Sequence, residues 1–410
     1  PGADAAQPAD FSSPYPPSVV ERFVWDASGN GGIGSLTRVD RVWQADNVTR
    51  YHHGGPIRFG PDGKLYIPLG DQRLSIEYAL NNGGVNNQVG VIHRINDDGT
   101  IPADNPFTVA NGSPAGTEKW FAYGIRNSFG LAFDPAVSDS ATGLWCTNNG
   151  ENIYDEFCRV PRALNGGANR ISGPTGHFRQ TGSIASLQYL PGSFYQNPEY
   201  SWYQTIGVTG LAFLYRSGLG AGFDDRAIVG TYNTGYLFGF RLNAPRNDLV
   251  LTHPGLQDRV DDRVPFSQNP LGTEAAETRF GNNFGSAFAG TIAVEVAPAP
   301  GYHGGQSPSS VGPASGKLGG VPYIVTANGR IVRITTRCIA DVASDSADVW
   351  FNPNGSVGPE DLEAFVNGFI AENAAIADVA SDSSDASRNP NGAVGAEDLD
   401  AFVNGFVAGC

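Results

Sequence analysis

Short apolar runs, rich in β-branched and aromatic residues and bounded by Gly, Pro, Asp or Asn, recur through the first three quarters of the chain. Such runs, separated by turn sequences such as PDGK, NDDG and ANGR, predict strands, because they are too short and too often interrupted to form helices. The high content of Gly (54) and Pro (28) and the low charged fraction of 16% agree with many tight turns. The clearest runs are 64–69 (KLYIPL), 89–95 (VGVIHRI), 130–133 (GLAF), 228–242 and 323–334.

A continuous chain of this kind predicts an all-β sandwich, barrel or propeller. The grouping of runs in sets of about four favours a β-propeller of about five to six four-stranded blades over residues 18–337. Residues 1–17, rich in Pro and Ala, predict an extended lead-in.

The chain ends in an internal repeat. Residues 341–370 and 378–407 follow one pattern with an offset of 37, in which an Asp/Asn-rich loop precedes a short amphipathic helix. One such helix cannot bury its apolar face alone, so the two halves of a small α-helical domain, 338–410, are expected to pack on each other. The apolar positions at helical spacing are Leu362, Phe365, Val366 and Phe369, repeated as Leu399, Phe402, Val403 and Phe406.

Most of the negative charge lies in this repeat. Of the net charge of −15, residues 338–410 contribute −12, from thirteen acidic residues and one Arg. An acidic segment on a nearly neutral body would repel nucleic acid and favours bound cations. No apolar run is long enough to span a bilayer.

Four cysteines form a near pair, Cys146 and Cys158, and a pair that brackets the repeat, Cys338 and Cys410. Their even number and layout predict two disulfides in an oxidising compartment, with free buried thiols as the alternative. The chain has no Met, from which we expect a processed product whose signal has been removed. The predicted location is secreted, outside a bacterial cell or on its surface.

Three stretches carry a family resemblance: 52–72 (HHGGPIRFGPDGKLYIPLGDQ), 123–135 with 145–156, and 208–242. Together they resemble the glucose/sorbosone dehydrogenases, which are soluble sugar dehydrogenases dependent on pyrroloquinoline quinone (PQQ). The resemblance covers most of residues 18–335. It implies a six-bladed propeller with PQQ and calcium in its mouth, although the first blade is short or absent here.

The resemblance also implies an activity, the oxidation of an aldose or oligosaccharide to a lactone with electrons passed to an external acceptor. His52 takes the place of the catalytic base, which removes the proton of the anomeric hydroxyl while hydride passes to the quinone. Arg126 and Asn127 match the pair beside the quinone oxygens. The structural alternatives are a turn histidine bonded to the backbone and an arginine in an inter-blade salt bridge.

Calcium is implied at the following acidic loop. Gly150 and Glu151 match the segment whose main-chain oxygens hold the cofactor calcium, and Asp155 and Glu156 follow at acidic positions of the family. Calcium prefers oxygen ligands, which such a loop supplies. The alternative is a solvated acidic turn.

Three expected cations are replaced. Asn233 stands where the family has a Lys against the PQQ carboxylates, and Thr291 and Ala293 stand where it has an Arg pair. Each charged hydrogen bond contributes on the order of 1.5–3 kcal/mol, so PQQ binding is expected to weaken by several kcal/mol. The arginines that could substitute are Arg58, Arg73 and Arg94.

The terminal repeat resembles dockerin modules, whose loops bind calcium through Asp and Asn oxygens and which join other proteins. It therefore implies calcium binding and a protein partner or self-assembly. The candidate ligands are Asp341, Asp345, Asp348, Asn352, Asn354 and Asp361, repeated as Asp378, Asp382, Asp385, Asn389, Asn391 and Asp398.

Two further readings stay open beside the dehydrogenase. One is a non-catalytic propeller that has lost PQQ and acts as an extracellular binding or assembly subunit. The other is a calcium-stabilised glycan-binding propeller, whose aromatic loop 195–203 could stack on sugar rings. A hydrolase is disfavoured, since the sequence has neither a GxSxG elbow nor an HExxH zinc motif.

Overall fold

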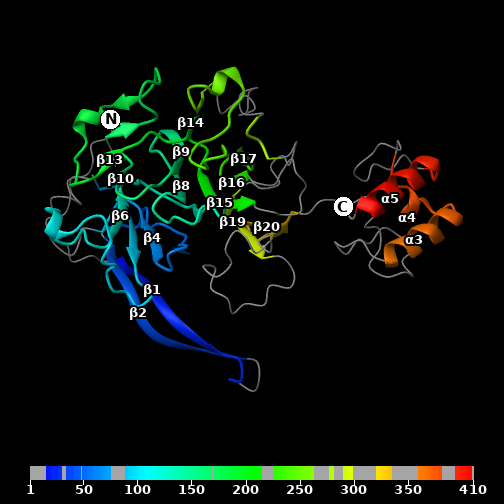
Figure 1. The fold of residues 1–410 in the computed structure, drawn as a ribbon, viewed down its shortest axis with the longest axis horizontal. Helices are drawn as coiled ribbons and strands as arrows, with labels where there is room; N and C mark the ends of the chain where they lie inside the picture. Colours follow the sequence, from blue (N-terminus) through cyan, green and yellow to red (C-terminus); the bar gives the residue numbers. More distant parts are fainter. Residues whose placement is uncertain are drawn as a thin grey trace. The chain divides into compact units, whose positions relative to one another are not determined.

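The computed structural model describes residues 15–29, 34–47, 49–74, 88–168, 170–214, 226–262, 277–280, 290–298, 320–334, 359–380 and 393–408. Two compact units make up the chain: Pro1–Ser217 with Ala221–Arg333, and Gly218–Gly220 with Ile334–Cys410. The first unit consists of strands and the second of helices (Figure 1). The predicted class, mostly β with few helices, is confirmed at this level.

The first large sheet is a four-stranded antiparallel meander, β3 to β6. Two later strands, β10 and β13, extend it in parallel beyond β6. Every residue of β4 and β5 is buried, including the polar His93 and Arg94 of β5. The strands are β3 (Arg58–Phe59), β4 (Leu65–Leu69), β5 (Val91–Ile95), β6 (Trp120–Tyr123), β10 (Leu164–Asn165) and β13 (Phe194–Tyr195).

The second sheet repeats this plan, with β7, β8, β9 and β14 antiparallel and β18 added in parallel. Large aromatic side chains fill its core, including Trp145, Phe157 and Trp202. The strands are β7 (Leu131–Phe133), β8 (Leu144–Asn148), β9 (Ile153–Arg159), β14 (Tyr200–Gln204) and β18 (Val260–Asp261).

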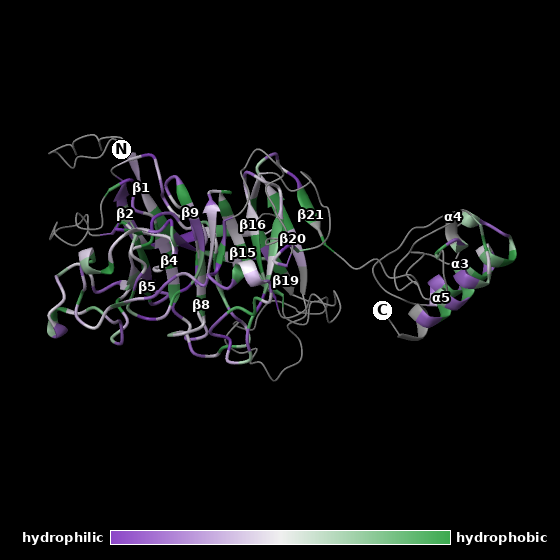
Figure 2. Ribbon diagram, turned by 90° about the horizontal axis from the view of Figure 1, so that it is seen from above, coloured by the Kyte–Doolittle hydropathy of each residue, from purple (hydrophilic) through white to green (hydrophobic). Residues whose placement is uncertain are grey.

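Two three-stranded antiparallel meanders follow. One contains β15 (Val208–Leu214), β16 (Arg226–Thr231) and β17 (Leu237–Arg241), and the other β19 (Thr291–Pro298), β20 (Gly320–Thr326) and β21 (Ile331–Arg333). Strand β15 contacts β7 and β8 on one side and β19 on the other. The sheets therefore lie side by side in chain order, as Figure 2 shows.

The predicted ring of five to six blades is not found among the described residues, which form four successive meanders without a closed ring. Strands β10, β13 and β18 extend two of these sheets beyond four strands. Because the sheets do not all have four strands, grouping the apolar runs in fours did not predict the number of blades. A separate hairpin precedes the meanders, formed by β1 (Tyr15–Asp26) and β2 (Ser35–Asn47). Its first strand includes Pro16 and Pro17, which the sequence assigned to the lead-in.

A smaller hairpin, β11 (Ile171–Ser172) with β12 (Thr181–Gly182), follows the second meander's first three strands. Three short 3-10 helices, η2 (Val109–Asn111), η3 (Ile184–Ser186) and η4 (Pro254–Leu256), lie in the connections. No helix in the described ranges is long and apolar enough to cross a membrane.

The second unit contains α3 (Pro359–Ile370), α4 (Ala374–Ala377) and α5 (Ala396–Ala408). The rings of Phe365 and Phe402, which are equivalent positions of the repeat, stack with centroids 3.8 Å apart at 7°. This contact confirms that the two halves pack on each other. The other apolar positions of these helices whose exposure is described do not all join this contact. Phe369 packs against the core, whereas four are exposed: Leu362, Val366, Leu399 and Val403.

The predicted disulfide between Cys146 and Cys158 is not formed. The two residues are in register across β8 and β9, and both are free thiols. A hydrogen bond with Cys146, followed by burial, raises the pKa of the Cys158 thiol, so the reactive thiolate is disfavoured. Cys338 and Cys410 lie outside the described residues.

Candidate functional site

His52 and Asp71 form the first part of the site. His52 precedes β3 with a positive φ of 55°, and Asp71 lies just after β4. The Nδ1 of His52 lies 2.5 Å from the Asp71 carboxylate, whose same oxygen accepts the backbone N–H of Arg73 at 2.9 Å. An imidazole that donates its Nδ1 proton to a carboxylate keeps the lone pair on Nε2. The sequence analysis did not identify Asp71, although an acidic residue directly after a buried strand was a usable signal.

Gly70 brings this pair close to Arg126. A Cβ at Gly70 would lie 2.6 Å from the His52 carbonyl oxygen and 2.7 Å from that of Arg126, so only glycine fits there. The Asp71 amide donates to the same Arg126 carbonyl at 2.8 Å. Gly54 makes room for the Pro68 carbonyl of β4. The glycines therefore assemble the site by letting backbone segments pack together.

The Arg126 guanidinium is held by carbonyls and forms no salt bridge with a carboxylate of the described residues. Its Nη1 donates to the carbonyl oxygens of Asn149 and Gly150, both at 3.0 Å. Burial lowers the pKa of Arg126, while nearby carboxylates, Asp71 first among them, act in the opposite direction. The site thus contains a fixed, half-desolvated positive charge.

Arg126 and Asn127 line a cavity of about 430 Å³, the central cavity. Two buried polar atoms in its wall, Asn127 Oδ1 and Thr209 Oγ1, have no hydrogen-bond partner. Buried polar groups are ordinarily paired, so these two atoms are exceptions in the wall of the cavity. Its wall contains Arg126, Asn127, Phe129, Asn149, Gly150, Glu151, Asp155, Thr205, Gly207, Val208, Thr209, Tyr232, Asn233 and Ile292.

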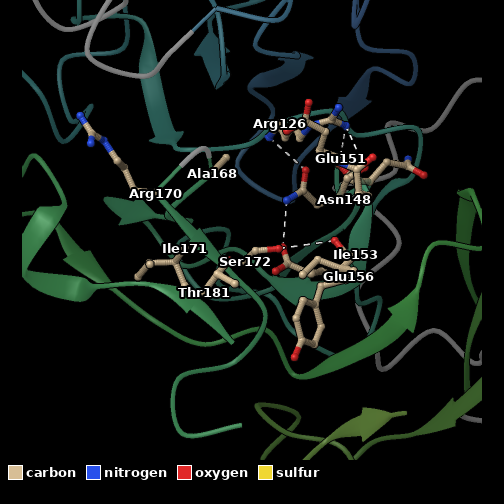
Figure 3. A pocket seen from close by; sticks show the side chains of 15 residues that line it. Arg126, Asn148, Glu151, Ile153, Glu156, Ala168, Arg170, Ile171, Ser172 and Thr181 are labelled. Atoms are coloured by element: carbon tan, nitrogen blue, oxygen red, sulfur yellow. Dashed lines mark hydrogen bonds between the residues drawn. The ribbon is translucent and has the colours of Figure 1, made fainter. Parts of the chain in front are cut away.

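A second cavity of about 480 Å³, the side cavity, shares Arg126 and the 149–151 segment with the central cavity. Figure 3 shows Asn148 between Arg126 and Glu156 in its wall. The Asn148 side chain accepts the Arg126 amide at 3.0 Å and donates to the Glu156 carboxylate at 2.9 Å. Burial raises the pKa of Glu156 to about 7, so this carboxyl titrates near neutrality.

Asp155 braces the backbone. Its carboxylate accepts the amides of Gly150 at 2.9 Å and of Ile206 and Gly207 at 2.7 Å. Burial raises its pKa to about 6 even though these amides favour the charged form. These bonds join the 149–151 segment to the loop between β14 and β15, which closes the central cavity.

The predicted calcium ligands are only partly assembled. The Gly150 carbonyl accepts from Arg126, and Asp155 is saturated by amides, which leaves Glu151 as the carboxylate common to both cavities. Within the described ranges no group of three or more His, Cys, Asp or Glu side chains is arranged to hold a metal ion. Calcium here therefore stays a prediction.

The residues that stand in place of the expected cations lie in different surroundings. Asn233 lines the central cavity, whereas Thr291 is fully buried in β19 and its neighbour Ile292 faces the cavity. Of the possible substitutes, Arg94 is bound to Asp62 and Asp104 and Arg58 to Glu295, so neither is available. Arg73 stacks at 4.1 Å on the Tyr51 ring, and its charge acts on Arg126.

In the second unit, three candidate calcium ligands are described, Asp361, Asp378 and Asp398, and all are buried. The Asp398 carboxylate accepts the amides of Val379 at 2.6 Å and of Ala380 and Gly395 at 2.8 Å. It therefore ties α5 to the segment that follows α4. The other candidates, which lie outside the described residues, are Asp341, Asp345, Asp348, Asn352, Asn354, Asp382, Asp385, Asn389 and Asn391.

Comparison with known proteins finds relatives that match part of this chain. A Synechocystis protein, "Uncharacterized protein slr1608", is 36% identical over 175 residues, 37% of this chain and 41% of that one. The aldose sugar dehydrogenase YliI of Escherichia coli is 29% identical over 167 residues, 40% of this chain and 41% of that one. The chain thus matches about two fifths of the length of these relatives.

Among solved structures, the PQQ-bound aldose sugar dehydrogenase of Streptomyces coelicolor aligns with a TM-score of 0.48 and 20% identity, over 76% of this chain and 70% of that one. The family profile described as Glucose / Sorbosone dehydrogenase matches residues 19–264, more than half of the chain. The chain therefore belongs to the glucose/sorbosone dehydrogenase family.

Proposed function

We propose that the first unit is a PQQ-dependent dehydrogenase that oxidises an aldose to its lactone and passes the electrons to an external acceptor. The observation that carries this proposal is the His52–Asp71 pair beside the half-buried guanidinium of Arg126, next to a cavity with unpaired polar atoms. Family membership supports the same reaction class.

The residues of the central cavity fit a flat, polar, anionic cofactor. The Thr209 hydroxyl, which has no partner among the described residues, would donate to an oxygen of such a ligand. Arg126 and Asn127 would hold the quinone oxygens, and Asn233 would contact a carboxylate with an amide in place of a charge. PQQ, when bound, supplies an electrophilic quinone carbon that accepts hydride. With Arg126 and Arg73 as its nearby cations, affinity is expected to be modest.

The role of His52 is to take the proton. Its Nε2 lone pair would accept the proton of the sugar's anomeric hydroxyl as the C1 hydrogen leaves as hydride, which turns the C1–OH group into the lactone carbonyl. Asp71, which accepts from Nδ1, would fix the tautomer and stabilise the resulting imidazolium. Arg126 would stabilise negative charge that develops opposite the base.

The proposal extends to the surroundings of this site. The four meanders would be blades of a propeller, with calcium bound at Glu151. The terminal repeat would bind calcium and attach the secreted enzyme to a protein partner or to other copies of itself. Its acidic loops and stacked helices support that role.

The test is dye-linked aldose oxidation after PQQ and calcium are added to metal-stripped protein. We expect sugar-dependent turnover that is lost in His52→Ala and kept in His253→Ala, a control at a distant turn. Wild-type protein that binds no PQQ at micromolar concentration and gives no turnover would contradict the proposal.

A second candidate is a non-catalytic propeller that binds a partner or a glycan. Asn233 in the cavity and the buried Thr291 favour it, because both replace cations that PQQ carboxylates need. The absorption spectrum separates the two candidates. A quinone band in protein purified from its source supports the enzyme, and its absence together with failed reconstitution supports the binding protein.

A further inference from the structure

Arg226 and Arg241 lie directly opposite each other on β16 and β17. Residues paired in this way project from the same face of a sheet, and like charges there are destabilising. Burial lowers the pKa of Arg226, and repulsion by Arg241 lowers it further. Two positive charges are therefore held together at a cost to the fold.

Neither arginine forms an ion pair with a described carboxylate, and the Nε of Arg226 is buried without an acceptor. Two other arginines of the first unit are neutralised by carboxylates. Arg246 pairs with Asp134, and Arg259 pairs with Asp248. The pair on β16 and β17 differs from these two arginines.

The two guanidinium groups line a pocket of about 170 Å³, the arginine pocket, together with Thr252, Glu277 and Thr278. Glu277 does not neutralise them, because its carboxylate accepts the amides of Thr252 and His253, both at 2.6 Å, and the Thr252 hydroxyl at 2.9 Å. The described residues that line this small pocket thus include two arginines and one carboxylate, which together carry one net positive charge.

We propose that the arginine pocket binds a compact oxoanion, a phosphate or sulfate group. Guanidinium groups pair with such anions through two parallel hydrogen bonds, and a bound anion would cancel the repulsion between the two arginines. The volume suits one tetrahedral group. The negative charge of Glu277 favours a small anion that contacts the arginines alone.

This pocket is separate from the central cavity. Arg226 begins β16, whereas Thr231 ends it and Asn233 follows. Six residues of strand extend over about 17–20 Å, so the two sites lie at opposite ends of one strand. The proposal is therefore independent of whether PQQ binds.

The test is calorimetric titration of the full chain, in calcium-free buffer of constant ionic strength, with inorganic phosphate, inorganic sulfate and glucose 6-phosphate, and with glucose as the neutral control. We expect saturable binding at one site and a rise in melting temperature. Arg226→Gln and Arg241→Gln should each weaken binding at least tenfold. Arg38→Gln, which removes an equal charge from β2, should not.

The comparison of glucose 6-phosphate with inorganic phosphate also identifies the source of the anion. Tighter binding of glucose 6-phosphate than of phosphate assigns the pocket to a phosphorylated sugar, and equal binding assigns it to the free anion. Absence of saturable binding, or equal affinity in wild type and both Gln variants, overturns the proposal. Arg241 is exposed, so its Gln variant decides the matter even if Arg226→Gln does not fold.

Discussion

His52 Nδ1 and Asp71 Oδ1 lie 2.5 Å apart, although 19 residues separate them in the sequence. The side chains are 11% and 5% exposed, so water competes little for this contact. Gly70 makes the pairing possible, since any larger residue would push the His52 and Arg126 carbonyls apart. A histidine with its tautomer fixed in this way is prepared to accept a proton on Nε2.

We predict that Asp71→Asn lowers kcat for aldose oxidation by about 10²–10⁴-fold, because an amide can hold the imidazole in the wrong tautomer. Asp71 acts through His52, so KM should change far less than kcat. The pH–rate profile should shift, and Asp71→Glu should recover part of the activity. Steady-state kinetics across pH 5–9 provide the measurement. A variant whose kcat stays within twofold of the wild-type value at every pH would contradict this role.

The unpaired hydroxyl of Thr209 gives a prediction that does not require turnover. In the absence of cofactor, Thr209→Val should leave the free energy of unfolding unchanged or raise it by about 1 kcal/mol, because it removes a buried hydroxyl without a partner. The same change should weaken PQQ binding. Urea unfolding and a PQQ titration measure the two effects.

Thr147→Val is the matched control for Thr209→Val. The Thr147 hydroxyl is buried and donates to the Thr209 carbonyl at 2.8 Å. Its loss should destabilise the protein by about 1–3 kcal/mol, because the carbonyl is left unpaired. Equal destabilisation by both variants would mean that the Thr209 hydroxyl is satisfied within the protein, and the argument for a ligand would fail.

The sequence was sufficient for the mostly β class. Arg126, Asn127 and Asn233, which the family resemblance assigned to the cofactor, line one cavity, and their roles stay predictions. Periodicity alone could not predict that Asp155 braces the β14–β15 loop, because its partner amides lie about fifty residues later in the chain. Nor could cysteine spacing decide the bonding of Cys146, since an in-register pair can remain two thiols.

The buried carboxyl of Glu156 predicts a pH-dependent stability. Burial raises its pKa from 4.5 to about 7, so the native state holds a proton that the unfolded state has already lost. Stability should therefore fall as pH rises from about 4.5 to 7 and level off above, by about 3 kcal/mol from this group.

Glu156→Gln should remove this group's part of the fall. Urea unfolding at pH 5 and pH 8, followed by the fluorescence of the buried tryptophans, is the measurement. Glu199, whose pKa burial raises to about 8, contributes a similar slope that persists in the variant. Glu118→Gln, on a turn, is the control, and its difference in stability between pH 5 and pH 8 should equal that of the wild type. An unchanged difference in Glu156→Gln would contradict the assignment.

The stack of Phe365 on Phe402 predicts how the second unit responds to mutation and to chelators. Phe402→Ala should destabilise this unit by about 3–5 kcal/mol, because it opens a cavity between α3 and α5. If the acidic loops bind calcium as the repeat predicts, EGTA should also reduce helical circular dichroism, and added calcium should restore it. Val403→Ala, at an exposed position of α5, is the control and should cost under 1 kcal/mol. Helicity indifferent to EGTA, with Phe402→Ala still destabilising, would mean that the aromatic stack and the amide bonds of Asp398 hold the unit together without a metal.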